Sequence, residues 1–281
     1  MSPLLSVPGL KKLLSHTDTV RILDATALLP GESTNPKLGF QRGHIPTSAY
    51  FDIDVFSDPE SSKPHTVPTP ARFERLFGAL GISNSDTVVF YDQGNSASSC
   101  RGWWLARLFG HENVYVLDGG LPEWLRQEGS VEQGDSVSAT AVPYVSHPYY
   151  ARLKGLGDML ACVQSGSNPI IDARSADRFY GRVPEPRPGL ASGHMPGAVN
   201  IPFKRLLDPS RRFLSADAAR QIFESHGITS TNPAITTCGS GMTASVLNVG
   251  LCLAGFPEGA LYDGSWAEWG AQPNTPVTKE D

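Results

Sequence analysis

The 281-residue chain carries one series of short motifs twice, and this duplication limits the folds that it can adopt. Four pairs of motifs recur in the same order and at a nearly constant separation. They are Ile-Leu-Asp-Ala at 22–25 with Ile-Ile-Asp-Ala at 170–173, Gly-His-Ile-Pro at 43–46 with Gly-His-Met-Pro at 193–196, the stretch 72–82 with 218–228, and Asp-Gly-x-x-x-Glu-Trp at 118–124 with 263–269. Because this period is far too long for a stacked array of small repeats, we predict two homologous domains.

The domain boundaries follow from a change in composition between the two copies. Residues 129–148 are rich in Ser, Gly, Val and Pro and show no helical periodicity, which is typical of a surface linker. We therefore expect an N-terminal domain over residues 1–128, a linker over 129–148 and a C-terminal domain over 149–281.

Each copy alternates two kinds of local pattern. Short apolar runs at 20–23, 87–91, 169–171 and 234–237 predict buried strands. Thr69 followed by Pro70 is typical of a helix start, and Ser215 is placed to cap the corresponding helix of the second copy. Strands that alternate with helices predict an α/β fold in which each domain has a parallel sheet covered by helices on both faces.

The overall composition excludes several classes of protein. Hydrophobic residues make up 40% and charged residues 18%, which indicates a globular chain, and the net charge of −5 without a basic stripe argues against nucleic-acid binding. The first 14 residues lack the pattern of a signal peptide, and no apolar run has membrane-spanning length. We therefore expect a cytoplasmic protein. None of the four cysteines forms a C-x-x-C pair, so no metal site is expected.

The segment around Cys238 carries the strongest chemical signal. The predicted strand ends at Thr237, and a helix is expected to begin near Thr243, so the thiol lies in a loop that leads into a helix. Gly239 and Gly241 allow backbone amides to turn inward, and converging amides stabilise an anion such as a thiolate. The alternative is a buried, inert cysteine in a glycine turn.

The first copy has no thiol at the corresponding position. The local sequence offset places Gln93 opposite Cys238, next to Asp92. Repeats that differ at the reactive position indicate one active site and one supporting, non-catalytic domain.

These features together resemble the tandem rhodanese-domain sulfurtransferases over nearly the full chain. The loop 238–243, Cys-Gly-Ser-Gly-Met-Thr, is similar to that of the mercaptopyruvate sulfurtransferase branch, in which Val usually stands where this chain has Met242. The resemblance implies a transferase that needs no cofactor. It also implies a persulfide on Cys238, loaded from 3-mercaptopyruvate with release of pyruvate and unloaded to a thiol acceptor such as thioredoxin, or to cyanide.

The residues after the cysteine bear on the choice of sulfur donor. Family members that prefer thiosulfate carry a basic pair there, whereas this chain has Gly239 and Ser240. A thiosulfate:cyanide sulfurtransferase (rhodanese) stays as the alternative function. The resemblance assigns the donor-binding part of the loop to Gly239, Gly241, Met242 and Thr243.

Two arginines are the candidates for binding the donor carboxylate. The resemblance implies Arg178 and Arg187, and the planar guanidinium group suits a carboxylate. The alternative is that they are surface charges paired with Asp177 or Glu185. Arg182 lies in the same segment and is not excluded.

Ser240 and His44 are the candidates for proton transfer. In the family, a serine of the loop and a histidine of the N-terminal domain are proposed to act together, and Ser240 and His44 are the residues matched here. The alternative is that His44 is structural, because the Gly-His-x-Pro motif also contains His194 in the second copy.

Two other classes of protein fit the sequence less well. A cysteine phosphatase of the same fold type needs an arginine six positions after the nucleophile, where this chain has Ala244. A non-enzymatic sulfur carrier or sensor would not need the loop together with the two arginines.

Overall fold

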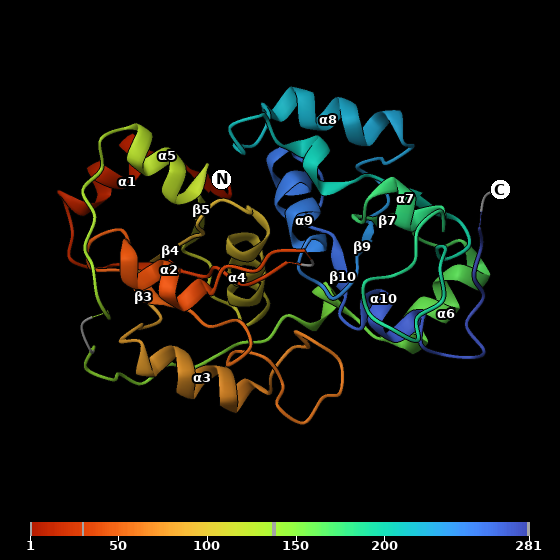
Figure 1. Ribbon diagram of the computed structural model, residues 1–281, viewed down its shortest axis with the longest axis horizontal. Helices are drawn as coiled ribbons and strands as arrows, with labels where there is room; N and C mark the ends of the chain where they lie inside the picture. Colours follow the sequence, from red (N-terminus) through yellow and green to blue (C-terminus); the bar gives the residue numbers. More distant parts are fainter. Residues whose placement is uncertain (1, 30, 137–138, 280–281) are drawn as a thin grey trace. The chain divides into compact units, whose positions relative to one another are not determined.

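The computed structural model describes residues 2–29, 31–136 and 139–279, which form two units (Figure 1). The first unit runs to Pro59, resumes over Val67–Tyr149 and includes Pro209–Phe213. The second unit contains Glu60–Thr66, Tyr150–Asp208 and the chain from Leu214 onward. Each half of the chain therefore contributes one short segment to the unit built mainly by the other half.

The first unit has a five-stranded sheet in the order β1-β5-β4-β2-β3. All four strand pairs are parallel. The strands are β1 (Leu4–Leu5), β2 (Val20–Asp24), β3 (Ala49–Tyr50), β4 (Thr87–Tyr91) and β5 (Val114–Leu117). The α-helices are α1 (Val7–Leu14), α2 (Pro36–Arg42), α3 (Pro70–Ala79), α4 (Ala97–Leu108) and α5 (Gly120–Arg126).

The second unit repeats this topology in the order β6-β10-β9-β7-β8. Its strand pairs are also parallel. The strands are β6 (Leu153–Lys154), β7 (Ile170–Asp172), β8 (Ala198–Asn200), β9 (Ile235–Thr237) and β10 (Ala260–Tyr262). The α-helices are α6 (Leu156–Ser165), α7 (Ala176–Phe179), α8 (Ala216–Ser225), α9 (Ala244–Leu253) and α10 (Ser265–Trp269), with 3₁₀ turns at Tyr150–Arg152 and Phe203–Leu206. The α/β fold with two homologous parallel sheets, predicted from the repeats, is confirmed.

Alternating side chains of a central strand show how helices cover both faces of a sheet. Val89 and Tyr91 of β4 lie in the core cluster that includes α1 and α5. Phe90 points to the opposite face. There its ring lies so close to Gly102 of α4 that a Cβ at this glycine would overlap it.

Local sequence signals explain where several helices begin. The hydroxyl of Thr69 accepts a hydrogen bond from the Arg72 amide, with Pro70 in the first helical position of α3. The hydroxyl of Ser215 accepts from the Ala218 amide at the start of α8. Both helix caps are those that the sequence predicts.

The segment 129–148 packs with the first unit as far as it is described. Val142 donates its amide to the carbonyl of Gly78 in α3, and the buried Tyr144 ring contacts Phe77. The segment is therefore anchored to α3 by backbone and aromatic contacts. In the described part of the chain, no helix is both long and apolar enough to span a membrane.

Candidate active site

Cys238 lies directly after β9, in a loop that leads into α9. Thr237 is the last strand residue, and α9 begins at Ala244 with Thr243 as its N-cap, as the sequence predicts. The Cys238 side chain is buried. The φ angle of Gly241 is +79°, a left-handed conformation that favours glycine, so the loop needs glycine at this position.

Two backbone contacts orient the peptide units next to Cys238. The amides of Trp266 and Ala267 in α10 donate to the carbonyls of Cys238 and Gly239, at 2.9 Å and 3.0 Å. In a trans peptide unit the carbonyl and the following N–H point in opposite directions. The N–H groups of Gly239 and Ser240 therefore point away from α10.

The loop leaves several backbone donors without an acceptor. Among the described residues, no group accepts a hydrogen bond from the N–H of Gly239, Ser240, Met242 or Thr243. Buried backbone donors are nearly always paired. Four neighbouring donors without partners, beside a buried thiol, indicate a site for an anion.

The first unit shows the same loop with an anion already in place. Ala25 donates its amide to Tyr91 as Ala173 does to Thr237, so Asp92, rather than Gln93, occupies the position of Cys238. The pairing of Gln93 with Cys238 that the local sequence offset predicts is therefore wrong by one residue, because the separation of the motif pairs is not constant along the chain.

The Asp92 carboxylate is hydrogen-bonded to the amides of its own loop. It accepts hydrogen bonds from the amides of Gly94, Ser96 and Ser99 at 2.9, 3.0 and 3.1 Å. The hydroxyl of Ser99 adds a fourth bond at 2.6 Å. The loop amides of this fold thus converge on a negative charge at the cysteine position.

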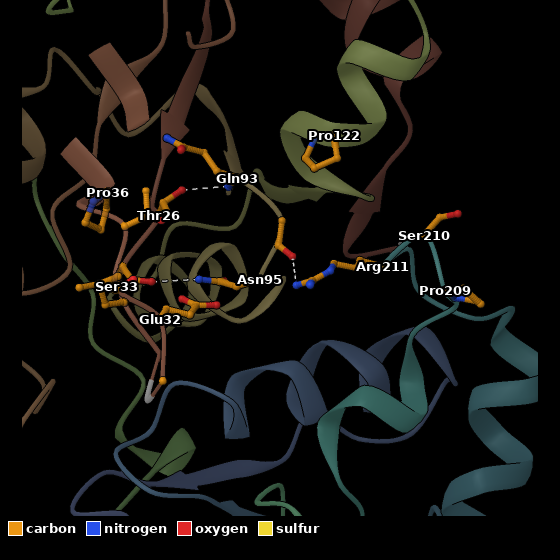
Figure 2. A pocket seen from close by; sticks show the side chains of 15 residues that line it. Thr26, Glu32, Ser33, Pro36, Gln93, Asn95, Pro122, Pro209, Ser210 and Arg211 are labelled. Atoms are coloured by element: carbon orange, nitrogen blue, oxygen red, sulfur yellow. Dashed lines mark hydrogen bonds between the residues drawn. The ribbon is translucent and has the colours of Figure 1, made fainter. Parts of the chain in front are cut away.

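A pocket of about 680 Å³ opens beside this loop of the first unit (Figure 2). Gln93 and Asn95 line it, together with Arg211 from the segment Pro209–Phe213, and the Arg211 guanidinium donates to the carbonyl of Gly94. The oxygen of the Asn95 side chain accepts from the Ala97 and Ser98 amides. None of the fifteen residues that line the pocket is a cysteine, so it offers no thiol for chemistry.

The structure brings Arg178 and Arg187 to the loop of Cys238. A Cβ placed on Gly239 would lie 3.1 Å from Nη2 of Arg178 and 3.7 Å from Nη1 of Arg187. Both guanidinium groups therefore lie against the residue that follows the cysteine. A side chain at position 239 would crowd them.

The two arginines differ in their partners. Arg178 forms a double hydrogen bond with Glu185, at 2.5 and 3.2 Å. The carboxylate of Glu185 also accepts a hydrogen bond from Arg174 at 2.8 Å. Arg187 has no hydrogen-bond partner among the described residues. Burial lowers the pKa of the Arg187 guanidinium, and the neighbouring Cys238 acts in the opposite direction.

Arg182 does not share this environment. It lies 3.8 Å from Asp177, and both side chains are mostly exposed. The alternative that the sequence left open concerns Arg178 and Arg187. Arg178 does pair with Glu185, but that pair is largely buried and is not a surface pair.

The imidazole next to Ser240 is that of His65. Its Nδ1 lies 3.0 Å from the Ser240 hydroxyl. Lys63 anchors the same segment, Glu60–Thr66, to the second unit through an ion pair of 3.0 Å with Glu268. Sequence reasoning missed His65, which lies outside the repeated motifs. The available signal was a histidine between two prolines in the loop before α3.

His44 and His194 occupy equivalent structural positions. The Nδ1 of His44 lies 3.0 Å from the Phe40 carbonyl, and the two rings stack at 4.0 Å. The Nδ1 of His194 lies 2.9 Å from the Phe179 carbonyl, with stacking at 3.9 Å. This repetition supports a structural role for the Gly-His-x-Pro histidine.

The other cysteines have different surroundings. Burial raises the pKa of the Cys100 thiol well above its usual value, with a further contribution from Asp92. The Cys162 thiol donates to the Asn168 carbonyl at 3.4 Å. Cys238 is the cysteine that lies in the glycine loop beside the arginines. In the described residues, no group of three or more His, Cys, Asp or Glu side chains is arranged to hold a metal ion.

Comparisons with known proteins find similar proteins over nearly the full chain. The family model described as the rhodanese-like domain matches residues 6–127 and 156–272. A mitochondrial protein of Arabidopsis thaliana named thiosulfate/3-mercaptopyruvate sulfurtransferase 1 is 37% identical over 297 residues, which cover 98% of this chain and 78% of that protein. The 3-mercaptopyruvate sulfurtransferase of Escherichia coli K12 is 37% identical over 272 residues, which cover 96% of each chain.

A solved structure shares the fold over nearly the full chain. The crystal structure of SseA from Escherichia coli, described as a 3-mercaptopyruvate sulfotransferase with the rhodanese fold, superposes with a TM-score of 0.85 at 32% sequence identity. The match covers 95% of this chain and 99% of that chain.

Proposed function

Because the chain belongs to the rhodanese family of sulfurtransferases, we propose that Cys238 carries the transferred sulfur as a persulfide and that 3-mercaptopyruvate is its donor. The observation that carries this proposal is the loop of unpaired amides around a buried thiol, with two guanidinium groups against Gly239. In the first half-reaction the Cys238 thiolate attacks the donor sulfur. The carbon–sulfur bond breaks, its electron pair forms the enolate of pyruvate, and protonation of the enolate gives pyruvate.

The first unit supports the role assigned to the amides. Asp92 has a carboxylate at the position of the cysteine, and this carboxylate accepts hydrogen bonds from the amides of Gly94 and Ser96. The corresponding amides in the second unit belong to Ser240 and Met242. We assign them to the anionic sulfur of the persulfide, which needs the same preorganised donors. The first domain, filled by its own carboxylate, is then the non-catalytic copy.

Arg187 and Arg178 are assigned to the donor carboxylate. Arg187 is half-buried and has no hydrogen-bond partner in the described chain, so its donors are available to a ligand. Arg178 is already held by Glu185 and offers its remaining donors in a fixed direction. A guanidinium group binds a carboxylate through paired hydrogen bonds, which orients the donor as well as attracting it.

His65 and Ser240 are assigned to proton transfer, in place of His44 with Ser240. The distance of 3.0 Å between the His65 Nδ1 and the Ser240 hydroxyl supports this choice, because a proton can pass between two groups that are hydrogen-bonded to each other. The pair can supply the proton that the pyruvate enolate takes up. The Nδ1 of His44 instead lies against the Phe40 carbonyl, and its Nε2 lies 3.9 Å from the Glu132 carboxylate.

The second half-reaction transfers the outer sulfur to an acceptor. A thiolate attacks it, a new sulfur–sulfur bond forms, and the Cys238 thiolate leaves. We propose a thiol such as reduced thioredoxin as the acceptor and cyanide as a substitute that yields thiocyanate. The cytoplasmic location expected from the composition stays a prediction.

Thiosulfate is the second candidate donor, because the Arabidopsis relative is named for both donors. A side-by-side measurement of kcat/KM for 3-mercaptopyruvate and thiosulfate tests the choice. We expect the larger value for 3-mercaptopyruvate, because positions 239 and 240 add no positive charge for a compact dianion. A larger value for thiosulfate would overturn the proposed donor.

A further inference from the structure

Ser265 has an unusual backbone for a residue with a side chain. It is the first residue of α10, its φ angle is +48°, and it is completely buried. Residues other than glycine rarely adopt this left-handed conformation, because Cβ approaches the backbone carbonyl. A serine at a buried position with this backbone conformation indicates that its hydroxyl has a role.

The hydroxyl of Ser265 is bonded to the Cys238 loop through two amides. Its Oγ accepts hydrogen bonds from the amide of Gly241 at 3.0 Å and from the amide of Cys238 itself at 3.4 Å. The hydroxyl donates its own proton to the carbonyl of Tyr262 at 2.9 Å. A hydroxyl group can donate one hydrogen bond and accept two, so the Ser265 hydroxyl makes every hydrogen bond that it can.

The first unit shows that the turn itself does not need the hydroxyl. Gly120 occupies the equivalent position with φ +58°, and Leu121 donates to the Asp92 carbonyl as Trp266 donates to the Cys238 carbonyl. A Cβ on Gly120 would overlap the Asp92 carbonyl oxygen. The same backbone is therefore built with glycine in the first unit, and only the unit that contains Cys238 has a hydroxyl there.

The two amides that Ser265 binds are not the ones left for an anion. With the amides of Cys238 and Gly241 tied to Oγ, and the carbonyls of Cys238 and Gly239 tied to α10, the loop is fixed on one side. The N–H groups of Gly239 and Ser240 are left pointing to the other side. Their direction depends on the loop being held in this way.

We infer that Ser265 is a positioning residue for sulfur transfer: its hydroxyl fixes the Cys238 loop so that the remaining amides converge on the transferred sulfur. This inference rests on the proposed function of Cys238. It assigns to Ser265 no contact with the donor, whose carboxylate is assigned to Arg178 and Arg187.

The test compares Ser265→Ala with Ser265→Gly. Both variants lack the hydroxyl, but only glycine also relieves the left-handed backbone, so Ser265→Gly should be the more stable of the two. We expect kcat with 3-mercaptopyruvate to fall about ten-fold in both, with KM changed less than about two-fold. Alkylation of Cys238 by iodoacetamide should be slower at neutral pH in both, and its pH profile should move to higher pH.

Ser99→Ala is the matched control. It removes a buried hydroxyl beneath the corresponding loop of the first unit, where Ser99 bonds to Asp92. We expect it to lower the melting temperature while leaving the alkylation profile of Cys238 as in the wild type.

Two results would overturn the inference. One is a wild-type kcat and alkylation profile in Ser265→Gly, because activity would then follow backbone strain and not the hydroxyl. The other is a wild-type alkylation profile in both variants. Alkylation needs no sulfur donor, so this readout is separate from the proposed function, which fails instead if the wild type forms no persulfide on Cys238.

Discussion

The different surroundings of Arg178 and Arg187 predict that their removal has different consequences. Arg187→Ala takes away a guanidinium group without a hydrogen-bond partner in the described chain, so stability should change little. Arg178→Ala removes two hydrogen bonds from Glu185, whose side chain is only 2% exposed and keeps only its bond to Arg174. A buried carboxylate left partly unpaired costs about 1–3 kcal/mol.

The kinetic effect of each change follows from the donor carboxylate. A hydrogen bond to a charged group contributes about 1.5–3 kcal/mol, and ~1.4 kcal/mol is a factor of ten, so kcat/KM should fall about 10- to 150-fold in either variant. The melting temperature should fall only in Arg178→Ala, by about 2–4 °C for each kcal/mol.

The assay pairs steady-state kinetics with thermal unfolding of the same preparations. Arg182→Ala serves as the control, because Arg182 forms an exposed surface pair and should leave both measurements unchanged. If Arg187→Ala lowers the melting temperature and leaves kcat/KM unaltered, the assignment of Arg187 to the donor is wrong. If Arg178→Ala and Arg187→Ala lose the same stability, the expected extra cost of leaving the Glu185 carboxylate partly unpaired is refuted.

Four further predictions test the rest of the site. Cys238→Ser should fold normally and transfer no sulfur, and mass spectrometry of the donor-treated wild type should place one added sulfur on Cys238; an added sulfur on another cysteine contradicts this. His65→Ala should lower kcat by about 10²-fold at unchanged melting temperature, whereas His44→Ala should lower the melting temperature at nearly unchanged kcat; the reverse pattern would restore His44 as the proton-transfer residue. Asp92→Ala should destabilise the first unit by about 1–3 kcal/mol, because it leaves buried amides unpaired. Cys238 should still accept sulfur in this variant, and loss of persulfide formation in the folded variant would count against a non-catalytic first domain. Gly239→Arg should raise kcat/KM for thiosulfate relative to kcat/KM for 3-mercaptopyruvate, because the new charge attracts a dianion and the new side chain crowds Arg178. The increase should shrink as salt is added, and an unchanged ratio would refute the role of this position in donor choice.

The sequence predicts the parts of this protein that depend on local patterns. The repeated Ile-x-Asp-Ala runs end β2 and β7, and the caps at Thr69 and Ser215 start α3 and α8 where expected. The glycines around Cys238 predict a strand-to-helix loop, and the structure has one. These features depend on neighbours a few residues away, which the sequence displays directly.

The missed features depend on contacts between distant segments. His65 and Ser240 are 175 positions apart, and no periodicity links them. A constant offset pairs Cys238 with Gln93, one residue past Asp92, because it cannot follow the unequal lengths of the two copies. The hydroxyl of Ser265 is hydrogen-bonded to the amide of Cys238, which lies 27 positions earlier in the sequence. The pairing of strands β9 and β10 brings these two residues together.

The exchanged segments mean that no continuous stretch of the chain encodes a complete site. A fragment that begins after the segment 129–148 would keep Cys238 and both arginines but would lose Lys63 and His65, which the first half of the chain supplies. In the other direction, Ser96 in the first half donates its hydroxyl to the carbonyl of Arg211. His65 and Arg211, which are equivalent when the helix caps are aligned, share left-handed φ angles of +60° and +63°. Reciprocal exchange of one segment is also the pattern by which identical chains form domain-swapped dimers, and here it occurs within a single polypeptide.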